Sequence, residues 1–88
     1  MTQNKKNETK KAYIYFSDTE RLRFGLLGYK YDNDQIKKFH QILVDYPNVP
    51  LIVTEPELAM IQKVIGDNTF FKDLKDKFQE VGRNIFGW

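Results

Sequence analysis

The stretch 71-FKDLKDKFQEVGRNIFGW-88 places its apolar residues on one side of a predicted helix. The intervals between them alternate between three and four residues, which matches the 3.6-residue turn of an α-helix; these residues are Phe71, Leu74, Phe78, Val81, Ile85 and Trp88. A stripe this rich in aromatic side chains has to be covered, either by the rest of the chain or by a partner. Gly82 lies inside the helix and is expected to fray or bend it.

A second helix is predicted from residues 32–34 to about Tyr46. Its first residues, Asp-Asn-Asp, are all good N-caps, and Pro47 cannot continue a helix. The only histidine, His40, falls on the apolar face of this helix. We therefore expect His40 to be a packed or half-buried side chain.

A third helix is predicted to follow Thr54 and to run to about Ile65. Thr54 and Glu57 have the spacing of a capping box, in which each side chain hydrogen-bonds to the backbone N–H of the other residue. Gly66 is suited to the C-terminal turn because it lacks a Cβ. The short β-branched run 51–53 before this helix is expected to be either a third strand or extended chain.

The N-terminal part of the chain is predicted to form a β-hairpin. Ala12–Ser17 is rich in aromatic and β-branched residues, which is typical of a strand. Arg21–Tyr31 begins with alternating apolar and polar residues and is interpreted as the returning strand. The alternation fails near Gly25–Gly28, where we expect a β-bulge or a bend.

These elements together predict an α+β fold. An antiparallel hairpin, with a possible short third strand at 51–53, packs against three α-helices within a single compact domain, residues 12–88. We expect the last helix to lie on the hairpin through contacts of its apolar stripe with Ile14, Phe16 or Phe24. Residues 1–11 are polar and lysine-rich and are predicted to be a disordered basic arm.

The net charge of +2 is unevenly placed. Residues 1–12 contain four lysines and one glutamate, whereas residues 13–88 contain ten basic and eleven acidic side chains. The predicted domain is therefore almost neutral. A folded surface that grips nucleic acid usually carries a larger excess of positive charge.

Composition argues against several kinds of chemistry. The chain has no cysteine, so thiolate metal sites and disulfides are impossible, and we expect neither a metal nor a cofactor. The only serine, Ser17, lacks the flanking glycines of a nucleophile elbow. No apolar run approaches the roughly 18 residues of a membrane span, and no secretory signal is apparent. The sequence predicts a non-enzymatic cytoplasmic protein that does not contact membranes.

The leading functional hypothesis is that the chain binds another protein as an adaptor, inhibitor or regulator. Tyrosine, arginine and tryptophan are the side chains that most often anchor protein interfaces, and the predicted anchors are Tyr13, Tyr15, Arg21, Arg23, Tyr29, Tyr31 and Trp88. Two alternatives stay open: the hairpin tyrosines could pack across the strands, and Trp88 could lock onto the core. Trp88 could also support a homodimer.

The alternative hypothesis is a regulator that binds nucleic acid, such as DNA. The last two helices are spaced like a helix-turn-helix pair, and a lysine-rich arm could add phosphate contacts. The candidate residues are Lys5, Lys6, Lys10, Lys11, Lys72, Lys75 and Lys77. Acidic residues share the face of the last helix and weaken this hypothesis.

Overall fold

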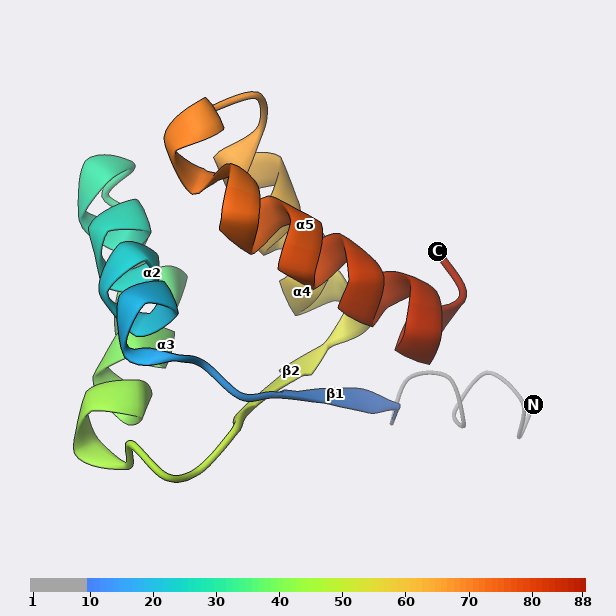
Figure 1. The fold of residues 1–88 in the computed structure, drawn as a ribbon, viewed down its shortest axis with the longest axis horizontal. Coiled ribbons are helices and arrows are strands. Elements are labelled where there is room, and N and C mark those ends of the chain that lie inside the picture. The colour runs from blue at the N-terminus through green and yellow to red at the C-terminus, as the bar shows by residue number, and fades with distance from the viewer. Residues whose placement is uncertain (1–9) are drawn as a thin grey trace.

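A two-stranded antiparallel sheet lies beside a group of helices in the computed structural model, which describes residues 10–88 (Figure 1). The described elements follow one another as β1 Lys11–Ile14, α2 Asp18–Lys30, α3 Asp34–Asp45, β2 Leu51–Thr54, α4 Glu55–Ile65, the 3₁₀ turn η1 Thr69–Phe71, α5 Lys72–Val81 and the π-helical turn η2 Gly82–Phe86. The predicted α+β class is confirmed. The basic arm predicted at residues 1–11 lies mostly outside the described residues.

One face of the sheet is buried and the other is exposed. Ala12 and Ile14 of β1 are buried, as are Leu51 and Val53 of β2. Tyr13 lies opposite Ile52 in the register, and both side chains are exposed. This alternation is what a strand pair with a single covered face requires. The short run at 51–53 is therefore a strand, and it is the partner of β1.

The predicted returning strand at Arg21–Tyr31 is wrong, because this segment is helix α2. Ser17 and Glu20 form a capping box: Glu20 N donates to Ser17 Oγ at 3.2 Å, and Ser17 N donates to Glu20 Oε1 at 2.9 Å. The polar residues that resembled a hairpin loop thus begin a helix. The apolar alternation after them is too short to distinguish a strand from a helix.

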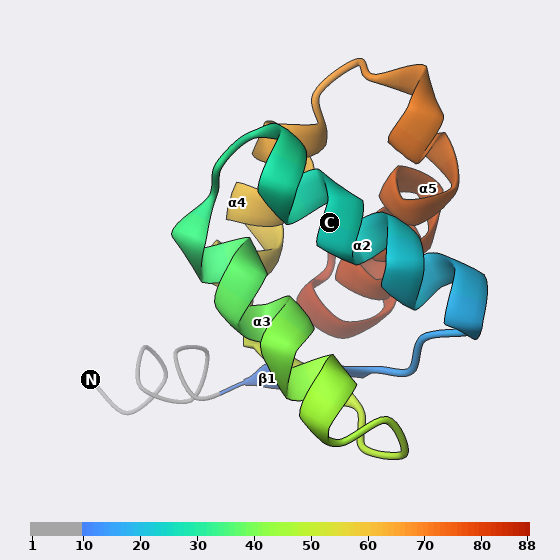
Figure 2. The ribbon, with the colours of Figure 1, turned by 90° about the vertical axis from the view of Figure 1, so that its left-hand side faces the viewer.

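The bulge predicted near Gly25–Gly28 is also wrong, because these glycines lie where α2 packs closely against α3. A Cβ on Gly25 would lie 2.6 Å from His40 Nε2, and one on Gly28 would lie 3.2 Å from Ile36 Cγ2. A Cβ at residue 25 would require the imidazole to move, and one at residue 28 would be tight against α3. Half-buried His40 packs there, as expected. Figure 2 shows α2 between α3 and α5.

The caps predicted for α3 and α4 are confirmed. Asn33 Oδ1 accepts from Ile36 N at 2.9 Å at the start of α3. At α4, Thr54 N donates to Glu57 Oε1 at 2.8 Å, which completes the predicted capping box. Gly66 ends α4 with a φ of 54°, a conformation that favours glycine.

The apolar stripe of the last helix covers the core, as predicted. Its buried members are Phe71, Leu74 and Phe78, and the Phe78 ring lies 6.0 Å from the rings of both Phe16 and Phe24. The regular helix ends at Val81 and changes to η2 at Gly82. The helix is thus irregular where Gly82 was expected to fray or bend it, and the irregularity takes the form of a π-helical turn.

Candidate functional site

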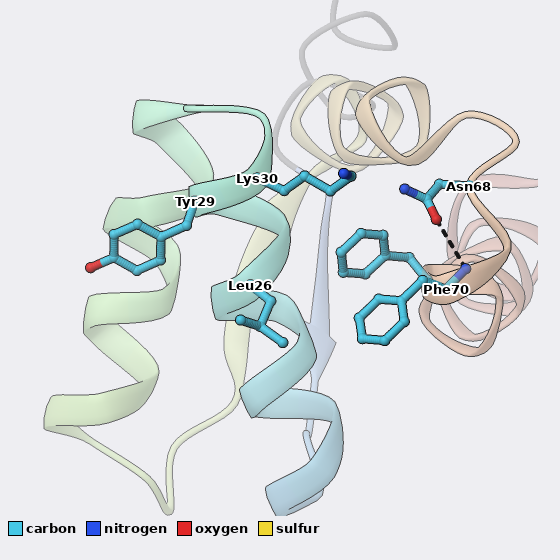
Figure 3. A pocket seen from close by; sticks show the side chains of 6 residues that line it. Leu26, Tyr29, Lys30, Asn68 and Phe70 are labelled. Carbon is cyan, nitrogen blue, oxygen red and sulfur yellow. Dashed lines mark hydrogen bonds between the residues drawn. The ribbon is translucent and has the colours of Figure 1, made fainter.

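A largely apolar groove of about 470 Å³ lies between α2 and η1 (Figure 3). Two elements that are far apart in the sequence form its walls, and the residues that line it are Leu26, Tyr29, Lys30, Asn68, Phe70 and Phe71. Leu26 and Lys30 point toward Phe70 and Asn68, while the Tyr29 ring is turned toward α3 (Figure 3). Concave apolar surfaces of this kind are the usual places where proteins bind ligands or other proteins.

The α2 wall is an exposed apolar stripe. Leu22, Leu26 and Tyr29 follow one another at intervals of four and three residues and are 64%, 43% and 72% exposed. They therefore share the face of α2 opposite the buried Phe24 and Leu27. This helix is apolar on two faces, and the described chain covers only one of them.

The η1 wall is held in place by hydrogen bonds and by a buried ring. Phe70 N donates to Asn68 Oδ1 at 3.0 Å, and Asn68 Nδ2 donates to Tyr31 Oη at 2.9 Å. The buried Phe71 ring contacts the Phe70 ring edge-on, with centroids 4.9 Å apart. Phe70 is 52% exposed, but the buried Phe71 ring and the hydrogen bond to Asn68 hold it in place.

The rim of the groove is cationic. Arg23 lies over the Phe70 ring, 5.3 Å from its centroid, and pairs with Asp73 at 3.4 Å. The Lys30 ammonium lies 5.7 Å from the centroid of the Tyr31 ring. Within residues 10–88, no carboxylate pairs with Lys30. The ammonium is therefore available to an acidic group outside the described chain.

The structure divides the protein-binding residues predicted from the sequence among separate places. Arg23, Tyr29 and Tyr31 gather at the groove. Tyr13 lies on β1 and Tyr15 directly follows it, and both line a second hollow of about 400 Å³ together with Lys77, Glu80 and Asn84. The expected continuous surface does not form because residues 21–31 are helical.

Arg21 and Trp88 take part in contacts within the chain. Arg21 pairs with Asp18 in the first turn of α2. The Trp88 indole lies against Gly82, and its Nε1 donates to Glu55 Oε2 at 2.9 Å. These contacts agree with the alternative in which Trp88 locks the last turn onto the core.

Sequence reasoning missed Leu22, Leu26 and Phe70. The spacing of Leu22, Leu26 and Tyr29 is a helical signal, but the strand interpretation placed the two leucines on a sheet face. Phe70 precedes the stripe of the last helix by one residue and therefore falls off its buried face. A search for helical spacing in 18–30 would have found the stripe, whereas the contact with Phe70 required the fold.

The lysines of the nucleic-acid alternative have partners within the chain where they lie on α5. Lys72 pairs with Asp76 at 2.7 Å, and this hydrogen bond raises the Lys72 pKa. Lys77 pairs with Glu20 at 3.2 Å, and Lys75 Nζ donates to the Gly66 carbonyl. Lys10 and Lys11 are exposed, while Lys5 and Lys6 lie outside the described residues.

The residues considered for catalysis take part in capping and packing contacts. Ser17 caps α2, and His40 packs against Gly25. Residues 10–88 contain no cluster of three or more His, Cys, Asp or Glu side chains that could hold a metal ion. None of the helices in this part of the chain has both the length and the apolar character needed to cross a membrane.

Comparisons with family models, curated proteins and solved structures found no match.

Proposed function

We propose that this protein is a non-enzymatic binding module that recognises another protein through the groove between α2 and η1, and so acts as an adaptor, inhibitor or regulator. The observation that carries the proposal is the exposed apolar stripe of Leu22, Leu26 and Tyr29 on α2, of which Leu26 points across the groove toward Phe70. Aromatic and aliphatic anchors next to a cation are typical of interface centres. Full burial of one such side chain contributes about 1.5–3 kcal/mol before the cost of association.

A charge placed in the groove tests this proposal. Leu26→Glu should abolish retention of the partner when the tagged protein is purified from its native cells, because it removes an apolar contact from the groove and adds a carboxylate that can pair with Lys30, four residues further along α2. The matched control is Ile42→Glu on α3, since Ile42 is 44% exposed and Leu26 is 43% exposed. The control should retain the partner, and circular dichroism should show both variants folded.

The purification is repeated with nuclease. A partner protein that remains after nuclease treatment and is lost only from Leu26→Glu supports the proposal. If the two variants retain the same proteins, or if the wild type retains none, the proposal is contradicted.

Nucleic-acid binding through α4, α5 and the lysine-rich arm is the alternative proposal. The α5 lysines that it needs already contact Asp76, Gly66 and Glu20. A salt-dependent gel shift that disappears when residues 1–11 are deleted would favour it.

We propose a cytoplasmic location because a cysteine-free chain fits a reducing compartment, and cell fractionation tests this.

A further inference from the structure

We infer that the groove takes an amphipathic helix of a partner protein that carries a carboxylate at the end of the groove formed by Lys30 and Tyr31. This inference rests on the proposed function and names the partner's chemistry. It depends on three features of the groove: the secondary structure of its walls, the length of the stripe, and the two hydrogen-bond donors at one end.

The walls of the groove favour a helix over an extended strand. An added strand needs a row of unpaired backbone N–H and C=O groups along the edge of a sheet. The walls here are α2 and the turn η1, whose backbone groups are mostly used within their own helices. Recognition must therefore come mainly from side chains, as it does when a helix lies in a groove.

The length of the stripe fits about two turns of a partner helix. Leu22 and Tyr29 are seven residues apart on α2, which is about 10 Å at 1.5 Å per residue. The ring of Tyr29, the last member of the stripe, lies on the α3 side, and Phe70 lies on the other side. Apolar side chains at positions i, i+3 or i+4, and i+7 of the partner would lie along Leu22 and Leu26 between these two rings.

Lys30, which lines the groove, and Tyr31, which is hydrogen-bonded to the lining residue Asn68, offer two hydrogen-bond donors at this end of the groove. Tyr31 Oη accepts from Asn68 Nδ2, and within residues 10–88 no hydrogen bond uses the Tyr31 hydroxyl as a donor. Lys30 Nζ lies over the Tyr31 ring and has no carboxylate partner there. A carboxylate can accept from both groups, and a charge-assisted hydrogen bond is stronger than a neutral one. Asp67 does not fill this role, since none of the ion pairs within residues 10–88 joins it to Lys30.

The same charges argue against a second copy of this chain as the occupant. A twofold axis that lays two α2 helices antiparallel along their stripes brings the same flank of each helix together. Arg23 and Lys30 lie on one flank, beside Phe70 and η1. The pairing would therefore bring cations toward cations, which disfavours association.

The test uses a display library built on a small helical scaffold with randomised surface positions, selected against the full-length protein. Enriched sequences should have apolar residues at helical spacing and an Asp or Glu beside them. Their affinity should fall at least about tenfold on Leu26→Glu, and about tenfold on Lys30→Glu because like charges then meet. Replacing the acidic residue of the binder by lysine should restore affinity for Lys30→Glu. The control Lys38→Glu makes the same charge change at an exposed site on α3 and should leave affinity nearly unchanged.

Each other result overturns the inference in a recognisable way. Binders that depend on Leu26 but are extended, neutral or indifferent to Lys30→Glu contradict the helix or the carboxylate and leave the proposed function standing. Sedimentation showing a dimer that Leu26→Glu dissociates would identify a second copy as the occupant. If no Leu26-dependent binder is found, the inference fails, and the proposed function then depends on the purification from native cells alone.

Discussion

Glu20 takes part in two interactions that link distant parts of the chain. Its carboxylate accepts from Ser17 N at 2.9 Å, which caps α2, and lies 3.2 Å from Lys77 Nζ on α5. Partial burial raises the Glu20 pKa, but the hydrogen bonds from Ser17 and Lys77 and the Lys77 charge outweigh it, so the pKa is lowered overall. The ionised form is therefore the one that the fold stabilises.

Glu20→Gln should lower the stability of the protein at neutral pH by about 0.5 kcal/mol, or roughly 2–4 °C in melting temperature, because glutamine keeps the cap but loses the charge.

A lowered pKa in the folded state means that this contribution is complete above the ordinary value of 4.5 and is lost as pH falls through the folded-state pKa. Thermal melts of the wild type and the variant should thus converge in acid. Glu80→Gln, at an exposed site on the same helix as Lys77, is the control. A difference that persists at low pH would contradict the assignment.

The turn between α5 and the C-terminus is shaped by one glycine. A Cβ on Gly82 would lie 2.1 Å from the Trp88 ring, and Trp88 N donates to the Gly82 carbonyl at 3.1 Å. The indole can lie against η2 and reach Glu55 on α4 only because residue 82 has no side chain. A π-helical turn begins at this residue, and such turns often mark places where a helix is adapted to a local contact.

Gly82→Ala should release Trp88 from this contact. The lost hydrogen bond to Glu55 costs about 1 kcal/mol and alanine favours the helix by about the same amount, so the melting temperature should change little. Fluorescence gives the clearer result because Trp88 is the only tryptophan: its emission should shift to the red and acrylamide should quench it more strongly. Arg83→Ala changes the exposed neighbour and should leave the emission unchanged. Unaltered emission in Gly82→Ala would show that the indole does not depend on the glycine.

At the scale of the molecule, a cluster of three phenylalanines joins the N-terminal and C-terminal elements. Phe16 follows β1, Phe24 lies on α2 and Phe78 lies on α5, and the Phe16 and Phe24 rings are 5.2 Å apart. Phe78 is fully buried and meets both other rings. The cluster therefore joins the helix that forms one wall of the groove to the helix that continues from the other wall.

Phe78→Ala should destabilise the protein by about 3–5 kcal/mol, because it removes a buried ring and leaves a cavity. A domain of this size has a total stability of roughly 4–13 kcal/mol, so the variant should unfold at a much lower urea concentration. Phe70→Ala removes the same side chain from an exposed site and should cost less than about 1 kcal/mol. Equal shifts in the two urea midpoints, followed by circular dichroism, would be incompatible with the packing described.

Local signals in the sequence were sufficient for most of the elements. The capping box at Thr54, the N-cap before α3 and the stripe of the last helix each involve residues within a few turns of one another, so their physical causes are visible without the fold. The segment 21–31 was misassigned because its alternating residues fit a strand while Leu22, Leu26 and Tyr29 fit a helix. The cap at Ser17 and Glu20 would have resolved this ambiguity.

The sequence alone therefore determined the α+β class, three of the four α-helices of the described chain and the apolar face that closes the core, since these depend on residues close to one another. The pairing of β1 with β2 and the groove between α2 and η1 were decided only by the tertiary structure. Residues about forty positions apart form each of them, and packing between distant elements, such as that of Phe78 on α5 against Phe24 on α2, brings such segments together. No local pattern in the sequence specifies which distant segments come into contact.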